Sequence, residues 1–95
     1  MKTVTFKGVV YNASGCAISL ILFNGNTNAV IWIHHYYNSF EFSCQLASGK
    51  YNLSINGITL GSLVFDISGD ISNITPQKSQ SYNQKVSDSY NFNIE

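Results

Sequence analysis

The sequence contains no arginine, and charged residues make up only 11% of its 95 positions. Five lysines balance five carboxylates, so the formal net charge at pH 7 is zero. Binding to nucleic acid depends on a cationic field facing the phosphates, and we therefore expect no nucleic acid partner. The same lack of charge gives no support for binding to a membrane surface, and we expect no membrane insertion.

The N-terminus lacks the pattern of a secretory signal. The first ten residues include lysines but no apolar run before Gly8, and they alternate like a strand. A signal peptide would instead place an apolar stretch after its basic residues. Two interpretations of the location stay open: a cytoplasmic protein, or a domain excised from an extracellular one.

Cysteine is scarce, with only Cys16 and Cys44 in the chain. A disulfide between them would indicate an oxidising compartment. We favour two half-buried thiols, because Cys44 lies inside a regular strand pattern and Cys16 lies in a predicted turn.

Catalytic motifs are also missing, and the two histidines are adjacent. His34 and His35 point to opposite faces of a strand, so they cannot bind one metal ion from a regular strand. No serine, cysteine or aspartate motif marks a nucleophile that a histidine base could activate. We therefore predict a protein that is not an enzyme, with no catalytic residue, no metal site and no cofactor.

What the sequence does contain is short runs that alternate between apolar and polar residues. Asparagine, serine, threonine, glutamine and tyrosine fill the polar positions, which suits exposed strand faces and disfavours helices. Asn- and Gly-rich turn signals separate the runs. We predict strands at residues 3–11, 17–23, 29–35, 40–46, 51–55, 63–67 and 90–94. This pattern predicts an all-β protein, a seven-stranded antiparallel β-sandwich that forms a single domain over residues 1–95.

The clearest alternation lies in residues 40–55, which read F-E-F-S-C-Q-L-A-S-G-K-Y-N-L-S-I. We predict two antiparallel strands here, joined by a short turn at residues 47–49. The inward row, which we expect in the core, consists of Phe40, Phe42, Leu46, Tyr51, Leu53 and Ile55.

Other segments are predicted as turns or loops. Residues 12–15 and the pair Asn56-Gly57 carry residue types that tolerate a positive φ. Residues 72–89 are mostly serine, asparagine, glutamine and lysine, with the only proline, Pro76. Because this composition buries little apolar surface, we predict a long polar loop at residues 72–89 and a terminal strand within residues 90–95.

The spacing of these motifs resembles the transthyretin-like, or prealbumin-like, sandwich of carboxypeptidase regulatory-type domains, which are common in bacterial surface proteins. The chain reads F-K-G-V-V at residues 6–10, F-E-F at 40–42 and L-A-S-G-K-Y-N-L-S-I at 46–55, with Gly15 ahead of Ile18. The resemblance covers residues 8–67 and implies a transthyretin-like or Ig-like sandwich. It also implies that Gly49 supplies a turn and that Tyr51 packs its ring inside. The Asp-Gly that usually precedes the F-x-F strand is Asn38-Ser39 here.

Some relatives in that family are hydroxyisourate hydrolases, whose site uses histidine and arginine residues and a C-terminal Tyr-Arg-Gly-Ser. This chain ends Tyr-Asn-Phe-Asn-Ile-Glu and has no arginine, so hydrolase activity does not carry over. The resemblance implies a non-enzymatic accessory module for binding, spacing or assembly.

The segments 17–23 and 29–35 are apolar on both faces, unlike the other predicted strands. One sandwich core can bury only one face of each sheet, so the second face must be covered by something else. The residues on that face are Ile21, Phe23, Ile31 and Ile33. We favour a protein-binding contact, either self-association into a homo-oligomer or a different protein partner. Two alternatives are a lid formed by residues 72–89 and pairing of an edge strand with another subunit.

An alternative function is a small carbohydrate-binding, lectin-like domain. Aromatic rings can stack on sugar C–H groups while amides and imidazoles bond the hydroxyls. The candidate residues for such a site are Trp32, Tyr36, Tyr37, His35 and Asn38. The competing interpretation is that Trp32 belongs to the core and the two tyrosines cover the end of a sheet.

Overall fold

The computed structural model describes residues 1–13 and 15–95, and in these residues it contains strands and turns but no helix. The prediction of an all-β, antiparallel protein is confirmed. The strands are β1 (Lys2–Tyr11), β2 (Cys16–Asn24), β3 (Val30–Tyr36), β4 (Phe40–Leu46), β5 (Gly49–Gly69), β6 (Ser72–Thr75) and β7 (Ser79–Ile94).

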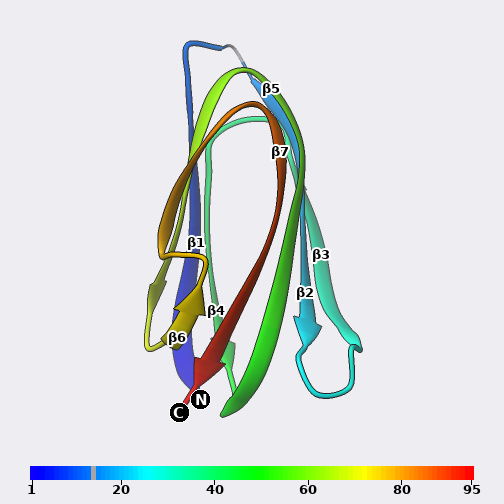
Figure 1. Ribbon diagram of the computed structural model, residues 1–95, viewed down its shortest axis with the longest axis vertical. Helices are drawn as coiled ribbons and strands as arrows, with labels where there is room; N and C mark the ends of the chain where they lie inside the picture. The colour runs from blue at the N-terminus through cyan, green and yellow to red at the C-terminus, as the bar shows by residue number, and fades with distance from the viewer. Residues whose placement is uncertain (14) are drawn as a thin grey trace.

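The strands form one antiparallel sheet that curls so that its two halves face each other (Figure 1). β5 belongs to both halves: its first part pairs with β2 and its second part pairs with β1. β7 follows β5 along almost its whole length, and both strands arch over at the same end of the molecule. We call the half with β3 and β2 the β3 half, and the half with β4 and β1 the β4 half.

The core lies between the two halves, where the inward side chains of every long strand meet. Contacts cross the gap: the Phe6 ring on β1 lies 5.4 Å from the Trp32 ring on β3, measured between centroids. Buried apolar side chains form a single cluster that runs through both halves. Its members are Val4, Phe6, Ile18, Leu20, Leu22, Phe40, Leu46, Tyr51, Leu53, Ile55, Leu63, Phe65, Ile67, Val86, Tyr90, Phe92 and Ile94. Of the inward row predicted in residues 40–55, only Phe42 is half-buried rather than buried.

The turn predicted at Asn56-Gly57 is wrong, because β5 continues through it as a single strand. The two predicted strands at 51–55 and 63–67 are parts of β5. The inward residues of both parts have odd numbers, so the period of two is never interrupted between Tyr51 and Ile67. The chain bends between Ile58 and Ser62, where the register with β7 shifts, and it does not reverse.

The hairpin predicted for residues 40–55 is also wrong, although both of its strands exist. β4 pairs with β1, whereas the first part of β5 pairs with β2 and β7. The short connection at residues 47–48 therefore crosses from one half of the curled sheet to the other. Alternation defines the faces of two strands but does not specify which strands become neighbours.

The long loop predicted at residues 72–89 is wrong as well. β6 and β7 occupy most of this segment, and the predicted terminal strand at 90–94 is only the end of β7. β7 has a polar outer face but buries an inner row that includes Val86, Tyr90 and Phe92. Pairing with β5 orders this segment as a strand, although its composition alone indicates a loop. The turn predicted at residues 12–15 includes Ser14, which lies outside the described residues.

Candidate functional site

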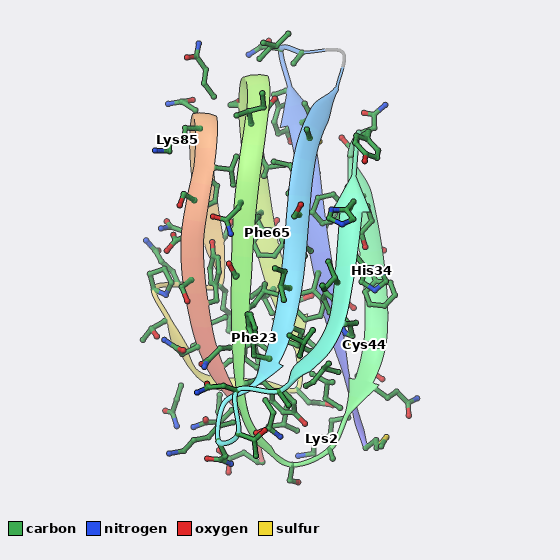
Figure 2. The ribbon with its side chains drawn as sticks, turned by 90° about the vertical axis from the view of Figure 1, so that its right-hand side faces the viewer. Lys2, Phe23, His34, Cys44, Phe65 and Lys85 are labelled. Carbon is green, nitrogen blue, oxygen red and sulfur yellow. The ribbon has the colours of Figure 1, made fainter. Side chains whose placement is uncertain are left out.

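Apolar side chains gather on the outer face of β2 and β3, where the sequence predicts a contact surface. Figure 2 looks onto this face, with Phe23 labelled on it. Ile21 lies directly opposite Ile33 in the β2–β3 register, and Phe23 lies opposite Val30. Ile33 is 52% exposed and Ile31 is 42% exposed, while Ile21 and Phe23 are half-buried. We call this surface the outer patch; it consists of Ile21, Phe23, Val30, Ile31 and Ile33.

Val30 is the member of the outer patch that sequence reasoning missed. Strict alternation along residues 29–35 places Val30 on the inner face with Trp32, but the structure leaves it 54% exposed. The register shifts between Leu22 and Phe23, so that Leu22 pairs with Trp32 but Phe23 pairs with Val30. Such a bulge leaves Ile31 as an extra residue and lets two successive side chains point outward. No turn residue in the sequence marks this bulge.

The neighbours of the outer patch on β5 and β7 are neutral and polar. Ser54 lies beside Ile21 and Asn52 lies beside Phe23 on the adjacent strand β5. The next strand, β7, continues these two rows with further serine and asparagine residues. The outer face of the β4 half differs, because it carries the Lys7–Glu41 ion pair, with 3.9 Å between Nζ and Oε1. The outer patch is thus apolar, uncharged and flanked by neutral polar groups.

The inner faces of β3 and β4 meet in a row of aromatic rings, which we call the aromatic seam. Tyr36 stacks on Phe40 with 4.0 Å between ring centroids and 9° between planes. Trp32 and His34 both contact Phe42, at centroid distances of 5.4 Å and 4.4 Å. Figure 2 shows His34 and Cys44 on the side of the molecule where these two edge strands lie.

The residues considered for carbohydrate binding do not come together on one exposed face. Trp32 and Tyr36 lie in the aromatic seam, half-buried. His35 is on the outer face, with its Nδ1 2.8 Å from Ser19 Oγ. Tyr37 and Asn38 are exposed beyond the end of β3, and the Asn38 side chain accepts a hydrogen bond from the Ser39 amide at 2.9 Å.

His34 and His35 point to opposite faces, as predicted, and among the described residues no group of three or more potential metal ligands comes together. Cys16 and Cys44 are both free and half-buried. Burial raises the pKa of both thiols, and in Cys44 the nearby Trp32 indole N–H opposes part of the rise. Raised pKa values keep thiols protonated at neutral pH, where they are weak nucleophiles.

A second surface, missed by sequence reasoning, lies at the end of the molecule where β5 and β7 bend. Ile58 and Leu60 project outward there, 60% and 81% exposed, on either side of the buried Thr59. Two open hollows of about 360 and 570 Å³ flank this ridge. The alternation Ile-Thr-Leu is the only available signal in the sequence, and it directly follows the Asn56-Gly57 pair that predicts a turn.

Inside the bend of β7, two tyrosines and a carboxylate form a hydrogen-bonded cluster. The Tyr82 hydroxyl donates to Asp88 Oδ2 at 2.8 Å and is also hydrogen-bonded to the Tyr90 hydroxyl. Tyr90 is fully buried. Burial, and then the charges of Asp88 and Asp66, raise the pKa of Tyr90 to about 12, against an opposing contribution from the Tyr82 hydrogen bond. Burial and the same hydrogen bonds also raise the pKa of Tyr82. Residue types alone give no sign of this cluster.

No family model, curated protein or solved structure matches the chain. Within the described residues, none of the secondary structure is a helix long and apolar enough to cross a membrane.

Proposed function

We propose that this chain is a non-catalytic interaction module that self-associates, or binds a protein partner, through the outer patch. The observation that carries the proposal is the exposure of Val30, Ile31 and Ile33 together on one strand, next to Ile21 and Phe23. Single exposed apolar residues are ordinary, but a contiguous apolar surface bordered by polar groups is typical of contact sites.

The magnitude of burial supports a weak but specific association. Covering an isoleucine that is about half exposed contributes roughly 1 kcal/mol, so the patch offers a few kcal/mol per copy before the cost of association. Interfaces of this small size usually give transient complexes and not permanent ones. The absence of charge on the outer patch removes electrostatic repulsion between copies, which favours self-association.

We further propose that the curled sheet is a seven-stranded sandwich of the transthyretin-like or Ig-like kind. Two observations support this finer assignment. Tyr51 is buried and stacks on Phe92 with 5.7 Å between ring centroids, as the resemblance implies for an inward ring. Gly49 begins β5 with a φ of 151°, which suits its expected place at the end of a turn.

Sedimentation velocity tests the proposed function. We expect the wild-type chain to self-associate at high micromolar concentration, and Ile31→Lys or Ile33→Glu to raise Kd by about tenfold or more, because each variant places a charge in the contact. The matched control is Val64→Lys, which changes an outward, half-exposed valine on the β4 half. A chain that stays monomeric at these concentrations, with no response to either patch variant, would contradict self-association through this surface.

A further inference from the structure

The sheet has unequal edges, and within the described residues 1–13 and 15–95 the β3 edge is the one that lacks the usual protection. β4 is one edge strand of the sheet, and it carries the exposed Glu41 on its outer face. Beyond β7, the strand β6 is only four residues long and pairs with β7 only near Asn91 and Asn93, while the uncovered part of the β7 edge carries the exposed Lys85. β3 ends the other side of the sheet with seven residues that read V-I-W-I-H-H-Y, with no lysine, glutamate, aspartate or proline.

Soluble proteins protect exposed sheet edges with charges, prolines, bulges or very short strands, because an unprotected edge pairs with other strands. β4 carries a charge, β6 is very short and the uncovered edge of β7 carries Lys85, so these edges follow the rule. β3 has a bulge near its first residues, but Trp32 to Tyr36 remain in regular register with β2. An edge of this kind is suited to pairing with another strand, whose outward side chains then pack beside those of β3.

We propose that a second copy of this chain adds its β3 antiparallel to β3, across a twofold axis at Ile33, so that one sheet runs through both copies. This inference rests on the proposed function, since it names the partner and the mode of contact at the same surface. Directly opposite residues of an antiparallel pair share a face. Ile33 therefore meets Ile33 of the other copy, and Ile31 lies opposite its His35.

The uncharged surface is what identifies a second copy as the partner. A twofold axis at Ile33 brings residues close to the axis near their own equivalents, so a charge there would repel itself. The outer side chains of β3 are isoleucine, valine and histidine, and the rows beside them on β2 and β5 are neutral. Pairing by this geometry joins the two outer patches into one stripe and gives the β3 backbone groups partners.

Disulfide trapping distinguishes edge pairing from face-to-face packing of the same patches. The experiment uses a Cys16→Ser/Cys44→Ser background, checked by circular dichroism, with either Ile33→Cys or Ile21→Cys added. In edge pairing the two copies of position 33 are direct neighbours, while those of position 21 are separated by about three strand spacings, or roughly 14 Å, too far for a disulfide. We expect Ile33→Cys to form a covalent dimer and Ile21→Cys to stay monomeric on a non-reducing gel.

If the Cys16→Ser/Cys44→Ser background is unstable, hydrogen exchange in the wild-type chain tests edge pairing instead. Amide hydrogen exchange at those of residues 32–34 whose N–H points away from β2 should slow about fivefold when the protein is raised to about ten times its Kd, because roughly four fifths of the chains are then paired. Edge pairing would be overturned, and the proposed function left standing, by a different result. In that result the patch variants weaken the dimer, Ile21→Cys but not Ile33→Cys forms a covalent dimer, and amide exchange is not slowed. A chain that is monomeric and insensitive to patch variants would overturn both.

Discussion

Replacing Gly57 with alanine should destabilise the fold by about 3 kcal/mol or more, the largest effect that we expect from a single methyl group. Gly57 has a φ of 151°, a backbone angle that residues with a side chain rarely adopt. A Cβ at this position would also overlap the carbonyl oxygen of Ala17 and lie 2.9 Å from the Ile18 Cα. Both contacts are with backbone atoms of β2, the strand paired to this part of β5, so a side-chain rearrangement cannot relieve them.

Gly49→Ala is the matched control, since Gly49 has the same φ of 151° but no atom within 4 Å of the position that a Cβ would occupy. This variant carries the backbone strain alone and should lose about 1 to 2 kcal/mol. Urea denaturation followed by tryptophan fluorescence measures both values, because Trp32 lies in the aromatic seam. Equal losses for the two variants would show that the close approach of β5 and β2 at Gly57 does not add to the backbone strain.

Individual strands are predictable from the sequence, but their connections are not. The predicted strand at 40–46 coincides with β4, because Phe40 and Leu46 bound a run with strict alternation. The prediction from sequence divides β5 into two strands because Asn56-Gly57 has the residues of a tight turn. The uninterrupted odd-numbered row from Tyr51 to Ile67 is the stronger signal, since a true turn has no reason to preserve it.

The missed strand β7 shows the limit of composition as a guide. Its inward positions are the even-numbered residues, including Tyr82, Val86 and Tyr90, and they keep one phase through the bend. Widely spaced apolar residues among serine and asparagine resemble a loop when each window is judged alone. Their order comes from pairing with β5, a long-range effect that local patterns do not contain.

The candidate site is partly predictable for a similar reason. Strands 17–23 and 29–35 have two apolar faces, and the structure places Ile31 and Ile33 on the exposed one. The bulge that adds Val30 depends on how β3 fits β2, so it has no counterpart in the sequence. The carbohydrate hypothesis assumes that neighbouring aromatic residues share a surface, whereas alternation along β3 sends Tyr36 inward and leaves Tyr37 exposed.

Raising the pH from 10 to about 12 should remove about 2 kcal/mol of stability through Tyr90 alone. The pKa of Tyr90 rises from its ordinary value of 10 to about 12 in the folded chain. Below pH 10 the phenol is protonated in both the folded and the unfolded chain, so its stabilising effect is fully present. Between pH 10 and 12 only the unfolded chain ionises, and the free energy of unfolding falls. Tyr82, whose pKa is also raised, acts in the same direction.

Circular dichroism and tyrosinate absorbance, followed together from about pH 8 to 12.5, test this effect, with the range set by the raised tyrosine pKa. We expect tyrosinate absorbance from the buried pair to appear with the loss of strand signal, because ionising Tyr82 or Tyr90 requires the cluster with Asp88 to open. Tyr90→Phe should flatten the alkaline decline even though it lowers stability at neutral pH. The matched control, Tyr37→Phe, changes an exposed ring and should leave the profile unaltered. A wild-type chain that ionises all its tyrosines while keeping its strand signal would refute the coupling between this buried cluster and the fold.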